Sequence, residues 1–320
     1  MPLAVWRLTV AYSLMMAGTS LMVLLAGIIG QAFAPSADLA TLPIALIVVG
    51  LAASTLPTGR LLARFGRRRV FITYGLLAVA AALIAMQSLV ADTFGGFCAA
   101  AVLMGWSAAA GHQYRFAALE AVPAERAAKA TSVLLFGGIL AAFVGPEIAV
   151  RGRYLLATEY AGSFLLLAFT YLAGIVLISF HSDRTLSASG HGGAGRPLAE
   201  ILRSPVVLVA VGSAALGYGI MSLLMTATPI SMHTHAGHSL EATKFVIQSH
   251  IAAMYLPSLL YAGLHSRWGH RGLLWSGVLI YALCLLIAAL NTDFLNYWSA
   301  LVLLGIGWNF LFLSGTNLLP

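Results

Sequence analysis

The sequence has 320 residues, of which 60% are hydrophobic and only 8% are charged, and its mean hydropathy is +0.93. That composition excludes a soluble globular domain and predicts an all-α protein that crosses a membrane several times. The formal net charge of +7 follows from where the basic residues fall along such a chain. It therefore gives no reason to expect nucleic acid as a partner.

Ten apolar runs follow one another along the chain, each near or above the roughly 20 residues that cross a hydrocarbon core. They cover residues 9–33, 40–62, 70–90, 95–115, 131–150, 158–180, 205–228, 243–265, 271–291 and 295–314. The first run is too long for a signal peptide and leads into the second without a convincing cleavage site. We therefore predict ten membrane-spanning helices.

The basic residues predict the orientation of these helices. If the N-terminus is cytoplasmic, only Arg151, Arg153 and Lys244 of the seventeen Lys and Arg residues fall outside. The other basic residues then lie at cytoplasmic ends or loops, as the positive-inside rule requires.

One basic segment occurs twice. Residues 61–68, Leu-Leu-Ala-Arg-Phe-Gly-Arg-Arg, return 203 residues later as residues 264–271, Leu-His-Ser-Arg-Trp-Gly-His-Arg. Each copy follows the second span of its half, so a duplicated six-helix half explains the period.

The first copy, Gly59-x-Leu61-x-x-Arg64-x-Gly66-Arg67-Arg68, resembles the loop signature of the major facilitator superfamily, and Glu120-x-x-Pro123-x-x-Arg126 resembles that family's next cytoplasmic loop. The resemblance implies two six-helix halves and a secondary transporter in a bacterial cytoplasmic (inner) membrane, acting as a monomer without a cofactor. The gating loops would contain Gly59, Arg64, Gly66, Arg67 and Arg68, and in the second copy Arg267, Gly269 and Arg271.

Two departures from the family pattern stand out. Ala63 and Ser266 occupy the place of the family's acidic residue, so we expect other contacts, such as helix-end dipoles facing the arginines, to hold the cytoplasmic side. The chain also stops after ten of the usual twelve spans, so we expect the C-terminal part to be missing. The predicted domains are 1–180, a six-helix half; 181–204, a Gly- and Ser-rich linker; and 205–320, an incomplete half.

Two pairs of possible metal ligands lie in the second half. Met221 and Met225, and His250 and Met254, are each four residues apart, which places each pair on one face of a helix. Thioether and imidazole suit soft copper ions. Methionine is also a common filler of apolar helices, but an ionisable histidine deep in a span is costly and usually functional.

The predicted exits of these spans, near Thr228 and Thr243, place Met221 and His250 at one level, roughly 10 Å below the outer surface. The turn above them carries four further possible ligands. They are Met232, His233, His235 and His238. We predict a copper capture site in this turn and passage inward along the two helices.

The stretch 237–258, together with residues 113–118, Gln-Tyr-Arg-Phe-Ala-Ala, resembles the CcoA-like copper importers of the superfamily. That branch supplies copper for assembly of cbb3-type cytochrome oxidase. By this resemblance Met221, Met225, His250 and Met254 would bind copper, the substrate, during import.

Two other functions stay open. Glu147, after Gly145-Pro146, is the candidate for proton coupling, unless it pairs with Arg151 or Arg153. Gly145-Pro146 resembles the start of a drug-antiporter motif, so a proton-coupled exporter of small organic molecules is one alternative. A membrane copper sensor or assembly factor without transport is the other. No catalytic motif is evident, so we do not expect an enzyme.

Overall fold

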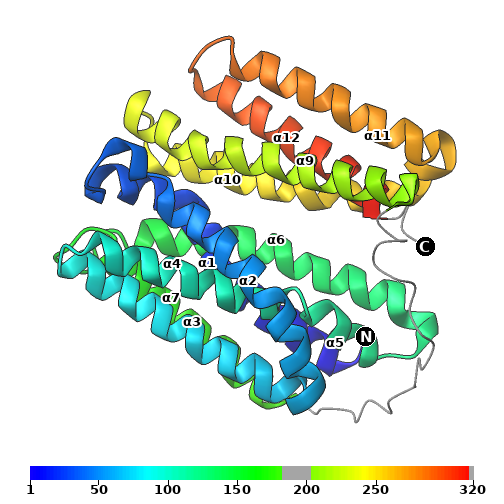
Figure 1. Ribbon diagram of the computed structural model, residues 1–320, viewed down its shortest axis with the longest axis horizontal. Coiled ribbons are helices and arrows are strands. Elements are labelled where there is room, and N and C mark those ends of the chain that lie inside the picture. The colour runs from blue at the N-terminus through cyan, green and yellow to red at the C-terminus, as the bar shows by residue number, and fades with distance from the viewer. Residues whose placement is uncertain (182–202, 317–320) are drawn as a thin grey trace. The chain divides into compact units, whose positions relative to one another are not determined.

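The computed structural model describes residues 1–181 and 203–316. Over these residues the chain is helical, and it forms two compact units, Met1–Thr185 and Leu186–Pro320 (Figure 1). Most of the predicted linker at 181–204 lies outside the described residues. Each unit is described by itself below.

The first unit contains seven α-helices and two short 3₁₀ turns among its described residues. They are α1 (Leu3–Phe33), η1 (Ala37–Leu39), α2 (Leu42–Phe65), α3 (Arg67–Val90), α4 (Phe94–Gly111), α5 (Tyr114–Glu120), η2 (Ala124–Arg126), α6 (Ala127–Arg151) and α7 (Ala161–Ser179). Together α4 and α5 form the predicted fourth span. The six spans predicted for this half are therefore all present.

Most of α1 is buried, because it packs against α6, α7 and α4. Small residues allow these close approaches. A Cβ at Gly145 of α6 would lie 2.1 Å from the carbonyl oxygen of Ala17 in α1. Gly145, part of the antiporter-like dipeptide, therefore has a packing role in the contact between α1 and α6.

The second unit is organised around its last helix. Its described elements are α9 (Pro205–Pro229), η3 (Ile230–His235), α10 (Leu240–Tyr255), η4 (Leu256–Leu259), α11 (Tyr261–Ala288) and α12 (Phe294–Thr316). Helix α12 packs against each of α9, α10 and α11. By contrast, α9 and α10 share at most a marginal contact.

The predicted eighth span is interrupted. Nine helices of the described residues are long and apolar enough to cross a membrane, and α10, with 16 residues, is not among them. It ends at Tyr255 and a 3₁₀ turn with Pro257 follows. Proline breaks an α-helix because it lacks the N–H donor and its ring clashes with the preceding turn. The chain then continues into the first residues of α11.

Gly269 divides α11 at the predicted boundary between the eighth and ninth spans. Its φ of 62° and ψ of 179° are not helical. Gly66, the matching residue between α2 and α3, has φ 80° and ψ 167°. The two copies of the basic segment thus have the same backbone conformation, one that is essentially restricted to glycine. This agreement supports the duplicated half inferred from the sequence.

Candidate functional site

The contact between α10 and α12 contains His250, whose side chain is fully buried. The helices approach closely because residue 305 of α12 is glycine, where a Cβ would lie 2.6 Å from the His250 carbonyl oxygen. The imidazole Nδ1 of His250 lies 2.8 Å from the carbonyl oxygen of Leu301. A carbonyl oxygen only accepts hydrogen bonds, so Nδ1 carries the proton and donates it.

That hydrogen bond determines what the other ring nitrogen can do. In the neutral imidazole a protonated Nδ1 leaves Nε2 with a free lone pair. Nε2 of His250 is buried and has no hydrogen-bond partner among the described residues. A buried polar atom without a partner costs about 1–3 kcal/mol, so this nitrogen is an acceptor that the fold leaves unused.

Asn309 of α12 repeats this pattern. Its Nδ2 donates to the carbonyl oxygen of Met254 and to Oγ of Ser258, both at 2.6 Å. These bonds stabilise the chain on either side of the break at Pro257. They also fix the orientation of the amide, because the Met254 carbonyl requires a donor. Oδ1 of Asn309 is buried and, within the part of the chain that the structure describes, has no hydrogen-bond partner.

Trp308, beside Asn309, adds an aromatic surface and a donor. Its ring stacks on Phe312, with centroids 4.7 Å apart and an interplanar angle of 10°. Nε1 of Trp308 is also buried without a hydrogen-bond partner among the described residues. Neither Trp308 nor Asn309 was predicted from the sequence as a site residue. A polar amide within an apolar span was the signal that could have identified Asn309.

The two predicted pairs of copper ligands lie on two different helices. Met221 and Met225 are buried in α9, whereas His250 and Met254 lie on α10. The two helices share at most a marginal contact, because both pack against α12 instead. Copper ligation by these four residues stays a prediction.

The helix ends lie at other residues than the predicted exits near Thr228 and Thr243. Helix α9 does not leave at Thr228 but continues through the wider, π-type turn η3 to His235. Met221 lies fourteen residues before His235, where η3 ends, and His250 lies ten residues after Leu240, where α10 begins. At 1.5 Å per residue, they lie about 21 and 15 Å from these two helix ends.

The predicted capture turn is mostly helical and well packed. Met232 is fully buried, and Nδ1 of His233 donates to the carbonyl oxygen of His238 at 2.8 Å. Nε2 of His238 donates to the carbonyl oxygen of Thr292 at 2.8 Å, which fastens this turn to the one before α12. His235 is exposed. Two of the three histidines therefore have structural roles, and copper capture here stays a prediction.

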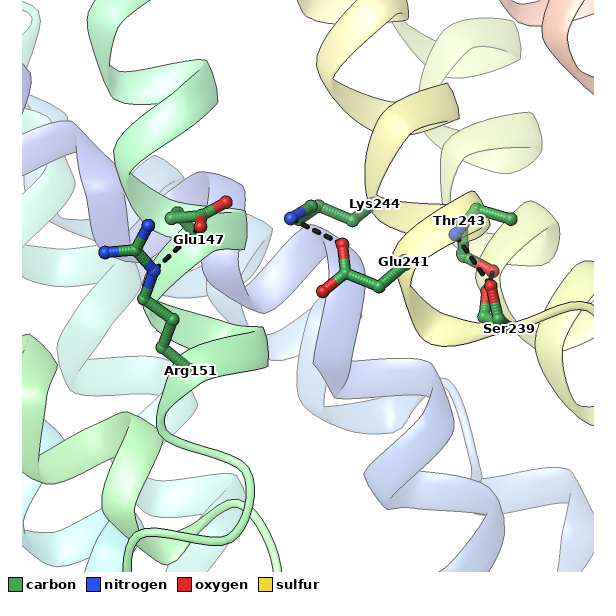
Figure 2. Close-up of polar contacts among 7 residues, drawn as sticks. Glu147, Arg151, Ser239, Glu241, Thr243 and Lys244 are labelled. Atoms are coloured by element: carbon green, nitrogen blue, oxygen red, sulfur yellow. Dashed lines mark hydrogen bonds and ion pairs between the residues drawn. The ribbon is translucent and has the colours of Figure 1, made fainter.

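Glu147 forms an ion pair near the end of α6. Its Oε1 lies 2.8 Å from Nε of Arg151, and the two side chains are 35% and 74% exposed, respectively (Figure 2). Arg153 pairs instead with Glu159 at 2.5 Å. This is the pairing with Arg151 that the sequence left open, and proton coupling through Glu147 stays a prediction. Figure 2 also shows the first turn of α10, where Lys244 lies 2.6 Å from Glu241.

The signature loop of the first unit is held by an ion pair that the sequence analysis did not predict. Nε and Nη2 of Arg67 both donate to the Glu120 carboxylate at the end of α5. This contact links α3 to α5 although Ala63 replaces the family's acid. The remaining predicted gating residues, Gly59, Arg64, Arg68, Arg267 and Arg271, are exposed.

The histidines of the second copy contact each other. The rings of His265 and His270 have centroids 4.2 Å apart. His270 stands at the position that Arg67 occupies in the first copy. The two copies therefore use different side-chain contacts.

A family model described as Major Facilitator Superfamily matches residues 8–320. A riboflavin transporter, RfnT of Brucella anthropi, is 35% identical over 312 residues, which cover 97% of this chain and 78% of that protein. An uncharacterized MFS-type transporter of Bacillus subtilis, YddS, is 31% identical over 325 residues, covering 95% and 73%.

Among solved structures, the inward-facing, unoccupied form of a bacterial homolog to the human lysosomal transporter Spinster is similar in fold. Its TM-score is 0.71 at 16% identity, and the match covers 98% of this chain and 74% of that one. At this identity the similarity supports the fold and says nothing about the solute.

Proposed function

The chain belongs to the Major Facilitator Superfamily and is a membrane transporter, and we propose that it carries riboflavin or a closely related uncharged flavin. The observation that carries this proposal is the 35% identity to the Brucella riboflavin transporter across 97% of the chain. Similarity of that extent includes the interior of both halves and not only the signature loops.

The chemistry of the second unit supports an uncharged organic solute. No Asp, Glu, Lys or Arg occurs between residues 204 and 240, between 245 and 266, or between 294 and 320. Among the described residues no group of three or more His, Cys, Asp or Glu side chains gathers to hold a metal ion. An apolar interior with a few polar atoms suits a planar heteroaromatic solute better than an ion.

The test is uptake of radiolabelled riboflavin by cells that cannot make riboflavin, with and without this protein. We expect the protein to raise initial uptake and to allow growth at low external riboflavin. Uptake into inverted membrane vesicles, compared with uptake into right-side-out vesicles, then gives the direction of transport. The direction separates an importer from the exporter that the sequence left open. Uptake equal to that of cells lacking the protein, at matched expression of a tagged chain, would exclude the proposal.

Copper import is the second candidate, and one observation favours it. Metal-bound histidines commonly donate their second ring nitrogen to a carbonyl oxygen, as Nδ1 of His250 does to Leu301. The separation of α9 from α10 gives this candidate less support. Uptake of radioactive copper by copper-starved cells tests it. Import requires uptake that falls when His250 or Met254 is changed to Ala, whereas copper binding without uptake would indicate a sensor.

We further propose that the protein is a monomer in a bacterial inner membrane with its N-terminus in the cytoplasm. The distribution of basic residues supports this orientation. Single cysteines introduced at Asp38 and Glu125, in a background lacking Cys98 and Cys284, test it. A membrane-impermeant maleimide should label intact cells at position 38 and not at 125, and the reverse pattern would contradict it.

A further inference from the structure

Two buried acceptors in the second unit share an arrangement that packing alone does not explain. Nε2 of His250 and Oδ1 of Asn309 are both left without a hydrogen bond among the described residues, and both side chains are at least 98% buried. In each case a backbone carbonyl oxygen, of Leu301 or of Met254, takes the donor of the side chain. In both side chains the atom left without a partner is therefore the hydrogen-bond acceptor.

The two acceptors lie along one helix contact, between α10 and α12. His250 and the Met254 carbonyl that orients Asn309 are four residues apart, about 6 Å along α10. One solute of moderate size could reach both.

The helix interruption lies at the same level. The 3₁₀ turn Leu256–Leu259 begins two residues after Met254, and Asn309 bonds to the chain on both sides of Pro257. Irregular backbone at membrane depth occurs where it is enclosed by protein or borders a cavity, and solute sites of transporters often use interrupted helices. The interruption is a second observation, independent of the unpaired atoms, that indicates a solute site.

We propose that Nε2 of His250 and Oδ1 of Asn309 accept hydrogen bonds from two N–H or O–H donors of the transported solute. This inference rests on the proposed function and specifies its recognition chemistry. The imide N–H of the flavin ring and the hydroxyl groups of its sugar-alcohol chain are donors of this kind. Nε1 of Trp308, on the same helix as Asn309, supplies a donor for a solute carbonyl.

The charged residues along this part of the sequence bear on the selectivity. The charged side chains nearest in sequence to His250 and Asn309 are Lys244, Arg267 and Asp293, each six or more residues away. The first of these, Lys244, pairs with Glu241, and burying a phosphate charge without a partner is costly. We therefore expect the site to favour riboflavin over its phosphorylated forms.

A matched pair of substitutions separates recognition from packing. In His250→Asn the amide nitrogen takes the place of Nδ1, so the hydrogen bond to Leu301 remains and Nε2 is removed. In His250→Gln an acceptor remains near the position of Nε2 and the Leu301 bond is lost. A residue that only joins α10 to α12 would tolerate Asn better than Gln. A recognition residue would tolerate Gln better than Asn.

The deciding measurement is the KM for uptake of riboflavin and of N3-methylriboflavin, which lacks the imide donor. We expect the wild-type protein to prefer riboflavin about tenfold, the value of one good hydrogen bond, and His250→Asn to lose that preference. His250→Gln should keep it at a lower expressed level. Asn309→Leu should instead reduce discrimination between riboflavin and lumiflavin, which lacks the hydroxyl chain.

Each outcome decides between the two proposals. Wild-type protein that does not transport riboflavin overturns the proposed function, and the inference with it. Riboflavin uptake with the same methyl discrimination in wild type and His250→Asn overturns the inference alone and assigns His250 to packing. Copper uptake that falls in His250→Asn while riboflavin uptake is unchanged would make Nε2 a metal ligand and would equally overturn it.

Discussion

In the first copy of the basic segment, Gly66 is followed by Arg67, which is paired with Glu120. In the second copy Gly269 is followed by His270, whose ring lies against His265. The glycines have nearly the same backbone angles, φ 80° and ψ 167° against φ 62° and ψ 179°. The duplicated halves have therefore kept the turn between helices, whereas the side chains that stabilise it have diverged.

The largest effects should come from the shared turn. We expect Gly66→Ala and Gly269→Ala each to lower the free energy of unfolding by about 1–3 kcal/mol, because a Cβ strains this backbone conformation. Thermal unfolding of the purified variants in detergent measures this loss of stability.

Gly59→Ala and Gly263→Ala are matched controls in the adjoining helices, where a Cβ would meet nothing within 4 Å. Alanine should be neutral or should stabilise these positions by up to about 1 kcal/mol. Equal stabilities for all four variants would contradict the role of the turn.

The next effect concerns the first copy alone. Glu120→Gln should destabilise the protein by about 1–2 kcal/mol, because it leaves the Arg67 guanidinium, 14% exposed, without a charged partner. Glu125→Gln, an exposed acid five residues away, is the control and should change stability little. If the two variants unfold at the same temperature, the ion pair does not hold the loop.

The ring contact of the second copy should contribute less. A double-mutant cycle of His265→Ala and His270→Ala should give a coupling of about 0.5–1 kcal/mol, the value of a ring pair beyond its burial. The same cycle on Arg67 and Glu120 should give a larger coupling. The reverse order would mean that the second copy carries the stronger contact.

The sequence predicted well what repeats or composition determine. The matching positions of Gly66 and Gly269, the two halves and the placement of His250 inside an apolar helix all followed from pattern. Helix neighbours did not follow, because an apolar run does not specify its packing partner. Thus α12, which separates α9 from α10, was unforeseen. The amide of Asn309 was visible in the sequence, but its partners were not, since it donates to the Met254 carbonyl at the end of another helix.

The smallest effect is expected for the solvent-exposed ion pair of Glu147 and Arg151, which serves as a comparison for the pair of Arg67 and Glu120. Glu147→Gln breaks the pair with Arg151, whose side chains are 35% and 74% exposed. Exposed pairs of this spacing contribute about 0.3–0.5 kcal/mol, and we expect losing the pair with Arg151 to cost about that much. We also expect unchanged riboflavin uptake at every external pH, because the pair is solvated at the end of α6. A change in the pH dependence of uptake would restore Glu147 as the coupling residue. A loss as large as that of Glu120→Gln would show that exposure does not explain the difference between the two pairs.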